Sequence, residues 1–568
     1  MLAVMRIVLA TLHSKYIHAS LALPYLAAYC GDLACDFEIR EFTVHEPQEN
    51  VLELLLASSP DVIALSVYLW NRRETLELVD ALAIAAPQVR IVLGGPEVSF
   101  EGTALLHAHP GICALVRGEG ELPLHGLLSA WLRHQQPDGV PRLTWREGKQ
   151  ITEGPDAPPL EDLDAIPSPF AAELVDLSRG FTYLETSRGC PYRCSFCMSA
   201  LDDSVRSFSM QRIRSDLRQL MDARVAKIKL VDRTFNYSPA RAREIFSFIL
   251  EHNRNSHFHF EIGAHLLDEE TLQLLATVPE GMFQFEIGVQ STLDQTLDNI
   301  DRHVDQQRLE ANVTRLQETG NITLHLDLIA GLPGESYPQL LSSIDRVIDM
   351  QPHHLQIELV KLLPGSPLRG AASECGIEFA PHPPYTVLST PEIDFAQLGL
   401  VRALSRVLDM TWNHGRMRGF LTALALQSGS FASGLELLSS TLKRKGMLRH
   451  PLSQRSLFEA LAGVVAENFH EMTRDRLTEH LARDYALSEK VALSSPPFFF
   501  SCDLNDSEQA MAREQLAIEL ESIRGQGVKL QHFACVFHHL HGEQRSLHLF
   551  LYFTRPGVGL EVTEKILA

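Results

Sequence analysis

Residues 181–197 read FTYLETSRGCPYRCSFC. The first seven residues are typical of a short buried strand, and three cysteines follow them within eight residues, at Cys190, Cys194 and Cys197. Nine cysteines placed at random in 568 residues would produce this pattern roughly 0.002 times per chain. The segment therefore predicts a strand followed by a tight loop whose three thiolates bind a metal.

Three cysteines on one loop allow three interpretations. A zinc knuckle needs a fourth protein ligand, and residues 200–215 contain no cysteine or histidine. Three unrelated buried thiols are a second alternative. An iron–sulfur cluster takes cysteine thiolates, and three of them on a [4Fe–4S] cube leave one iron open to substrate or cofactor. The spacing favours the cluster.

The predicted strand is the first of six strand–helix units. Because six units are too few for a complete eight-stranded barrel, we expect a partial, TIM-like (β/α)6 barrel with its active residues at the carboxyl ends of the strands. The six predicted strands are 181–187, 227–232, 258–264, 283–290, 322–331 and 355–363.

A similar alternation precedes this series. Five short buried strands with helices between them predict a Rossmann-like, doubly wound parallel sheet, whose ligand would lie outside the carboxyl ends of the strands. After about residue 381 the pattern becomes mostly helical, with a small α/β segment at the end. The expected parts are 1–135 (Rossmann-like domain), 136–178 (linker with a possible hairpin), 179–385 (barrel), 386–494 (helical domain) and 495–568 (small α/β segment).

Composition restricts the function classes. Fifty basic and seventy-one acidic residues give a formal net charge of −21, which favours a small-molecule substrate over nucleic acid. No stretch reaches the roughly 18 uninterrupted apolar residues of a membrane span, and Arg6 interrupts the apolar start that a signal peptide would need. Scattered cysteines argue against a disulfide scaffold, so we expect a cytoplasmic protein.

The cysteine loop resembles that of the radical S-adenosylmethionine (SAM) superfamily. The resemblance covers about 175–380 and rests on Cx3Cx2C with an aromatic residue, Phe196, before the last cysteine. It implies a [4Fe–4S] cluster whose open iron chelates the amino and carboxylate groups of SAM and whose electron generates a 5′-deoxyadenosyl radical. Phe196 would then lie near the adenine.

Two further motifs imply contacts with SAM. FEIGVQS resembles the GVQS strand of enzymes of the oxygen-independent coproporphyrinogen oxidase type, and LDLIAGLPGE resembles their D-x-I-x-G-L-P motif. The match implies that Glu261 and Gln290 bind the ribose hydroxyls, that Arg302 meets the methionyl carboxylate, and that Asp327 reaches the adenosine or its ribose. Carboxylate, amide and guanidinium groups suit these partners.

The second strand departs from this pattern. It ends in LVDRTFN instead of the Gly-Gly-Glu that often binds the methionyl amine. We therefore expect Asp232 to bind the amine. Arg233, Asn236 and His265 are candidates for contact with the substrate.

The N-terminal part resembles the cobalamin-binding domain found before many radical SAM domains. Its marks are GGPE at 94–97, RGEGE at 117–121 and SVY at 66–68. His13 has the offset of the cobalt-ligating histidine in D-x-H-x-x-G, but that motif's Asp and Gly are missing, and with them the carboxylate that orients the histidine. Cobalamin held without a protein ligand and a domain that binds no cobalamin are the alternatives. The predicted contacts are His13, Ser66, Gly94, Gly95 and Glu119.

The whole layout is similar to cobalamin-binding radical SAM proteins with a DUF4080-type C-terminal domain. The resemblance implies an oxygen-sensitive enzyme, with cobalamin-dependent methyl transfer to an unactivated carbon as the favoured reaction. Radical cyclisation or rearrangement without methyl transfer is one alternative, and a non-enzymatic iron–sulfur or electron-transfer protein is another. A reducing partner such as flavodoxin or ferredoxin is implied.

Overall fold

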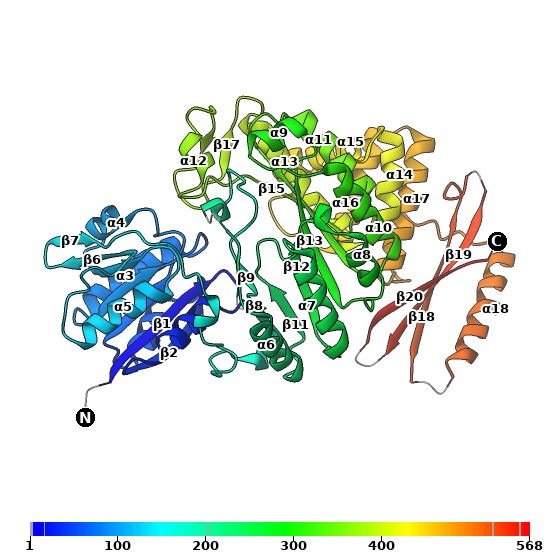
Figure 1. The fold of residues 1–568 in the computed structure, drawn as a ribbon. Coiled ribbons are helices and arrows are strands. Elements are labelled where there is room, and N and C mark those ends of the chain that lie inside the picture. The colour runs from blue at the N-terminus through cyan, green and yellow to red at the C-terminus, as the bar shows by residue number, and fades with distance from the viewer. Residues whose placement is uncertain are drawn as a thin grey trace. The chain divides into compact units, whose positions relative to one another are not determined.

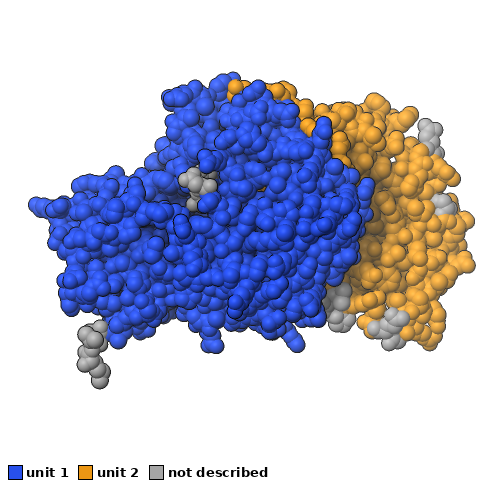
Figure 2. Space-filling model, in the orientation of Figure 1, with its two compact units in different colours: residues 1–325, 331–334, 360–391 blue, residues 326–330, 335–359, 392–568 orange. Residues whose placement is uncertain are grey.

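The computed structural model describes residues 4–15, 18–201, 204–524, 527–542, 544–555 and 558–567. The chain forms two compact units (Figure 2). Unit 1 comprises residues 1–325, 331–334 and 360–391, and unit 2 comprises residues 326–330, 335–359 and 392–568.

The N-terminal sheet of unit 1 has the strand order β2-β1-β3-β4-β5-β6-β7. The first five strands in the chain pair in parallel, as predicted. The hairpin expected after residue 135 forms from β6 and β7 and extends this sheet in antiparallel fashion. The strands are β1 (Met5–His13), β2 (Cys35–Thr43), β3 (Val62–Ser66), β4 (Arg90–Gly94), β5 (Ile112–Val116), β6 (Leu143–Glu147) and β7 (Gln150–Glu153).

Helices cover both faces of this sheet (Figure 1). Ile7 and Leu9 of β1 pack with one group of helices, and Val8 and Ala10 pack with the other, because successive side chains of a strand point to opposite faces. The doubly wound prediction is confirmed. One face carries α1 (Ala22–Tyr29) and α5 (Glu121–Leu132), and the other carries α2 (Gln48–Leu56), α3 (Arg72–Ala85) and α4 (Gly102–Ala108).

The second series forms a six-stranded sheet in the order β15-β14-β13-β12-β11-β8. Its strands β8, β11, β12 and β13 pair in parallel within unit 1, which confirms the partial-barrel prediction. The strands are β8 (Phe181–Leu184), β11 (Lys227–Leu230), β12 (His257–Ile262), β13 (Phe283–Gln290), β14 (Thr323–Ala330) and β15 (His354–Leu359). The helices between them are α6 (Met210–Asp222), α7 (Pro239–His252), α8 (Glu269–Leu275), α9 (Asp294–Asn299), α10 (Gln306–Thr319) and α11 (Tyr337–Asp349).

The strands of this sheet have an aromatic face and a polar face. Phe260 on β12 and Phe283 on β13 pack against Phe246 of α7, with ring centroids 5.1 and 5.4 Å apart. All three rings are fully buried. Alternation along the strands therefore turns Glu261 and Glu286 to the opposite, inner face.

Unit 2 is helical and ends in a three-stranded antiparallel sheet, as expected for the C-terminal part. None of the described helices is long and apolar enough to cross a membrane. The helices and strands of unit 2 from residue 392 on are α13 (Phe395–Met410), α14 (Arg418–Ser428), α15 (Phe431–Arg444), α16 (Gln454–Asn468), α17 (Glu471–Ser488), α18 (Asp506–Ser522), β18 (Lys529–Phe537), β19 (Ser546–Arg555) and β20 (Val558–Ile566).

A buried ion-pair group ties β20 to its neighbours. Glu564 lies 2.7 Å from Nδ1 of His548 on β19 and accepts hydrogen bonds of 2.6 to 3.0 Å from Arg483 on α17. Burial opposes ionisation of this carboxyl, but the contacts with His548 and Arg483 lower its pKa to about 2. Glu564 is thus expected to stay ionised at neutral pH.

Candidate functional site

The cysteine loop is closed at its base. Short antiparallel strands β9 (Ser187–Arg188) and β10 (Arg206–Ser207) pair on either side of it. Gly189 has φ +90°, and a Cβ there would lie 2.2 Å from the carbonyl oxygen of Ser204, so only glycine fits this turn. Ser195 donates its N–H to Ile300 O at 2.9 Å and accepts from Leu368 N at 2.8 Å. The backbone of the loop is therefore held from two sides.

The three thiols lie at the carboxyl end of β8, where the sequence predicted them. Cys194 is buried, whereas Cys190 and Cys197 are partly exposed. Burial raises the pKa of the Cys194 thiol, and the Arg302 guanidinium, whose Nη1 is 3.5 Å from its sulfur, acts against that rise. A cation beside the thiols suits a group that carries several thiolates.

The spacing of the thiols suits a cluster better than a single zinc ion. Tetrahedral zinc with Zn–S bonds of about 2.3 Å would hold its sulfur atoms about 3.8 Å apart. Among the described residues, the one group of three potential ligand atoms that lie within 4.8 Å of one another is His259, Glu261 and Glu286. Cys190, Cys194 and Cys197 do not form such a group, so at least two of their sulfur atoms are farther apart than 4.8 Å, and a donor set of three thiolates fits a [4Fe–4S] cluster.

Arg302 links the loop to the end of β13. Its Nη2 donates to Gly288 O at 2.5 Å, and its guanidinium lies 5.4 Å from the ring centre of Tyr192 in the cysteine loop. The hydroxyl of Tyr192 is 2.5 Å from Nε2 of His265. Burial, with the nearby positive charge of Arg302, lowers the pKa of His265 to about 4. His265, predicted as a substrate contact, is buried; its Nε2 is engaged by Tyr192, and its Nδ1 has no hydrogen-bond partner among the described residues.

Gln290 and Glu261 lie at or near the strand ends, on the inner face. Gln290 has φ +69°, and its Oε1 has no hydrogen-bond partner among the described residues. A Cβ on Gly288 would lie 2.2 Å from Gln290 Nε2, so glycine is needed for this side chain to fold back. A buried amide oxygen without a partner is costly unless a ligand satisfies it. This atom therefore fits the predicted ribose contact.

Asp232 and Asn236 have other partners than those the sequence suggested. Asp232 is fully buried and accepts hydrogen bonds from Thr186 N at 3.1 Å, Thr186 Oγ1 at 2.6 Å and Ser187 Oγ. Asn236 is also buried and exchanges two hydrogen bonds with the backbone of Gly263. The predicted contacts of Asp232 with the methionyl amine and of Asn236 with substrate do not fit this geometry, because Asp232 is engaged by Thr186 and Ser187 and Asn236 by the backbone of Gly263.

The remaining predicted contacts are partly accessible. Arg233 is exposed at the end of β11, and its charge lowers the pKa of Glu261 against the larger raising effect of burial. Phe196 is partly exposed within the cysteine loop. Asp327 lies on β14 in unit 2 and is also partly exposed.

The carboxyl edge of the N-terminal sheet brings three predicted contacts together. Ser66 ends β3 and pairs in register with Gly94, which ends β4. Gly95 has φ +104°, and a Cβ there would lie 2.5 Å from the carbonyl oxygen of Val67. The hydroxyl of Ser66 is buried and has no hydrogen-bond partner among the described residues. A close backbone turn and an orphan hydroxyl fit a ligand at this edge.

His13 has a neighbouring carboxylate, although the Asp of the D-x-H-x-x-G motif is missing from the sequence. Its Nε2 lies 3.2 Å from Glu41 Oε1, from the adjacent strand β2. Arg179 is 2.7 Å from the other oxygen of Glu41. The expectation that no carboxylate orients His13 is wrong. The parallel pairing of β1 with β2 brings Glu41, which is 28 residues away in the chain, next to His13. His13 would have to give up Glu41 to bind cobalt through Nε2.

A charged clamp, which was not predicted from the sequence, joins the N-terminal sheet to the base of the cysteine loop. Arg206 of β10 binds Glu119 with two contacts of 2.5 and 3.2 Å, and Arg188 of β9 lies 2.7 Å from Glu121. Arg188 also reaches Glu185 at 3.0 Å. Burial raises the pKa of Glu185 to about 7, despite Arg188. The RGEGE motif is recognisable in the sequence, but the arginines that pair with its glutamates are not.

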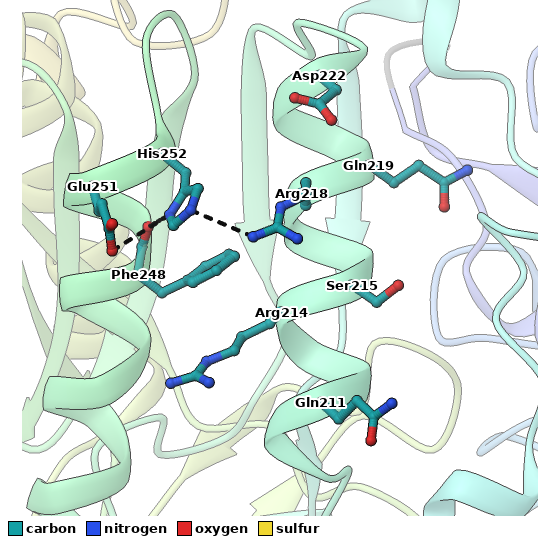
Figure 3. A pocket seen from close by; sticks show the side chains of 9 residues that line it. All are labelled: Gln211, Arg214, Ser215, Arg218, Gln219, Asp222, Phe248, Glu251 and His252. Carbon is teal, nitrogen blue, oxygen red and sulfur yellow. Dashed lines mark hydrogen bonds and ion pairs between the residues drawn. The ribbon is translucent and has the colours of Figure 1, made fainter.

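A surface hollow between α6 and α7 lies apart from these residues (Figure 3). Phe248 stacks on His252 at 4.2 Å, and the guanidinium groups of Arg214 and Arg218 lie 5.8 and 5.5 Å from its ring centre. The hollow is lined by the outer helices and not by strand ends. It contributes none of the predicted cofactor contacts.

Three family models match the chain in the predicted order. The B12 binding domain matches residues 6–128, the radical SAM superfamily matches residues 184–347, and a protein domain of unknown function, DUF4080, matches residues 373–531.

Curated proteins and solved structures agree with this layout. The cobalamin-dependent radical SAM methyltransferase TokK of Streptomyces tokunonensis is 29% identical over 59% of this chain and 51% of its own length. The 2-(S-pantetheinyl)-carbapenam-3-carboxylate methyltransferase of Streptantibioticus cattleyicolor shows the same identity and coverage. The chain thus spans about half the length of these relatives.

The fold has solved counterparts. The structure of the cobalamin-dependent SAM radical enzyme OxsB with aqua-cobalamin and SAM bound has a TM-score of 0.60 at 17% identity, over 93% of this chain and 81% of that one. This likeness shows the fold alone. The family matches show a B12 binding domain, a radical SAM domain and a DUF4080 domain in this chain, in that order.

Proposed function

We propose that this protein is a radical SAM enzyme that uses cobalamin to transfer a methyl group to an unactivated carbon of a small-molecule substrate. The observation that carries the proposal is the cysteine loop, which projects from the end of β8 and is clamped to the edge of the B12 binding domain by Arg188 and Arg206. The methyltransferase names of the two curated relatives favour methyl transfer over cyclisation.

When bound, the [4Fe–4S] cluster and SAM supply a 5′-deoxyadenosyl radical, and cobalamin supplies the methyl group. Cys190, Cys194 and Cys197 are proposed to hold the cluster. For SAM, the proposed contacts are Phe196 with the adenine, Glu261 and Gln290 with the ribose, Arg302 with the methionyl carboxylate and Asp327 with the adenosine. Asp232 is proposed to position the loop instead of binding the amine.

The proposed cobalamin contacts lie at the edge of the N-terminal sheet. Gly94 and Gly95 would allow close approach of the corrin's nucleotide tail, and Ser66 would donate or accept one hydrogen bond. Glu119 would contribute its main chain, because its carboxylate is engaged by Arg206. His13 would line the site without ligating cobalt, because Glu41 is beside its Nε2.

The proposal also includes the source of electrons and the location. The cluster needs a one-electron donor, and a flavodoxin or ferredoxin is the proposed partner. A reducing cytoplasm is the proposed location, because it keeps free thiols available for the cluster. The exposed Arg233 remains a proposed substrate contact.

Anaerobic reconstitution tests the proposal. The protein should bind about four irons, retain cobalamin after growth with cobalamin, and convert SAM to 5′-deoxyadenosine under a low-potential reductant. Cys194→Ala should abolish the cleavage. Failure of the intact, iron-loaded protein to cleave SAM with any reductant would refute the proposal, and the absence of cobalamin absorbance would refute its second cofactor.

A further inference from the structure

The inner face of the barrel sheet carries a group of four polar and charged side chains, of which the proposed cofactor contacts include only one. We call Lys229 on β11, His259 and Glu261 on β12, and Glu286 on β13 the inner cluster. The ammonium of Lys229 is 3.5 Å from Glu261 and 3.4 Å from Glu286, and Nε2 of His259 is 2.9 Å from Glu286. These residues alternate with the phenylalanines that pack against α7.

Most of the inner cluster lies below the proposed SAM site. Glu286 precedes Gln290 by four residues on β13, which is roughly 13 Å at about 3.3 Å per residue. His259 pairs in register with Lys229 and precedes the end of β12 by three residues. Only Glu261 is shared with the proposed ribose contacts. The other three charged or ionisable groups therefore have no cofactor to bind.

A metal ion is not the partner of the inner cluster. The ligand atoms of His259, Glu261 and Glu286 lie within 4.8 Å of one another. The ammonium of Lys229, however, is already beside both carboxylates and takes the place of the cation. Burial opposes its charge, but Glu286 and Glu261 raise the pKa of Lys229, so it remains protonated and repels a metal ion.

The inner cluster can be reached by solvent and faces the B12 binding domain. The side chains of Lys229, Glu261 and Glu286 are 28%, 30% and 25% exposed. Tyr183 on β8 pairs in register with Lys229, and its hydroxyl lies 2.9 Å from Nδ1 of His18. His18 belongs to the segment that follows β1, whose carboxyl end lies at the same edge of the parallel sheet as the ends of β3 and β4, where Ser66 and Gly94 lie. The cluster therefore lies where a substrate would meet both parts of unit 1.

An apolar substrate does not suit this surface. Contact with it would strip water from an ammonium and two carboxylates without replacing the lost hydrogen bonds, which is unfavourable. The ammonium of Lys229 has three N–H donors and contacts the two carboxylates at 3.4 and 3.5 Å, so at least one N–H is not needed for these contacts and can serve a polar group of a ligand. We propose that the inner cluster binds a polar, hydrogen-bonding group of the substrate, and that the substrate is a water-soluble molecule and not a lipid-like one.

This inference rests on the proposed function and is tested with the reconstituted full-length protein. An anaerobic extract of the cells that make the protein is partitioned between water and an organic solvent, and each fraction is added with SAM labelled in its methyl group. The aqueous fraction should support transfer of label to a new product. Transfer supported by the organic fraction would overturn the inference.

Matched lysine variants test the inner cluster itself. Lys229→Met should lower transfer with the aqueous fraction at least tenfold, whereas Lys227→Met, two residues earlier on the same strand and exposed, should change it less than twofold. Glu286→Gln keeps the side-chain volume and should cause a similar loss of transfer. It serves as the second test if Lys229→Met folds poorly. Equal effects of Lys229→Met and Lys227→Met in iron-loaded proteins would overturn the assignment.

The same preparations separate this inference from the proposed function. SAM cleavage without extract is measured in each of them. A protein that forms no 5′-deoxyadenosine would refute the proposed function. A protein that cleaves SAM but methylates only material from the organic fraction would refute the substrate class alone.

Discussion

The clamp between the B12 binding domain and the cysteine loop gives a quantitative prediction. Arg206 is 9% exposed and binds both oxygens of Glu119, and it also donates to Leu160 O at 2.5 Å. Arg206→Met keeps most of the side-chain stem and removes all of these hydrogen bonds. Glu119 then retains Arg188, at 3.5 Å, and a backbone hydrogen bond from Leu160.

Breaking a buried ion pair costs about 3–5 kcal/mol. Glu119 is 23% exposed and keeps a second arginine, so we expect a smaller loss of about 2 kcal/mol. If opening of the loop requires breaking the clamp, this loss corresponds to a roughly 30-fold larger open population. Amide hydrogen exchange at residues 187–199 should become faster by this factor.

Mass-spectrometric hydrogen exchange of the full chain is the assay, and Arg214→Met is the matched control. Arg214 forms an ion pair with Glu244 at 2.8 Å, but both side chains are more than 40% exposed, so its loss should cost less than about 1 kcal/mol. Unchanged exchange at 187–199 in Arg206→Met, or equal acceleration in Arg214→Met, would show that the clamp does not hold the loop.

Three further predictions concern other parts of the chain. Because the pKa of Glu564 is lowered from 4.5 to about 2, the stability that its ionised form provides should be lost as the pH falls from 4.5 to about 2. Limited proteolysis in this pH range should therefore cut the C-terminal sheet. The Glu564→Gln protein should be cut already at neutral pH, whereas the protein with the exposed Glu561→Gln should not. Gly95→Ala should reduce bound cobalamin, measured by absorbance, because its Cβ would strike the backbone, whereas Gly139→Ala, with no atom within 4 Å, should not. His13→Ala should retain cobalamin. The electron paramagnetic resonance (EPR) spectrum of cob(II)alamin in the wild-type protein should lack nitrogen hyperfine splitting from a protein ligand. Loss of cobalamin in His13→Ala, or such a splitting in the wild type, would contradict this.

Periodicity predicted the order of the strands well but not the way they end. The segment 181–187 was expected as one strand, yet β8 stops at Leu184 and Ser187 starts β9. Asp232 binds Thr186 and Ser187 and turns the chain into the cysteine loop. Pairing of β9 with β10 joins segments on either side of that loop, which no local pattern reveals.

In the candidate site, too, local features could be predicted from the sequence and contacts between distant residues could not. The cysteines were identified because their spacing is local and rare. The partners of His13 and Glu119 come from distant positions, Glu41 and Arg206, and each is an ordinary charged residue in the sequence. Burial, which decides whether Asp232 can meet a ligand, is likewise a property of the packed chain.

The central claim is that three cysteines hold a cluster with one iron open to SAM. The most direct measurement is EPR spectroscopy of the reduced, reconstituted protein with and without SAM. The account predicts a cluster signal that shifts when SAM is added, in the wild type and in Cys375→Ala, a cysteine outside the loop, and no such cluster in Cys194→Ala. A spectrum that SAM leaves unchanged, or a cluster that survives in Cys194→Ala, would contradict it.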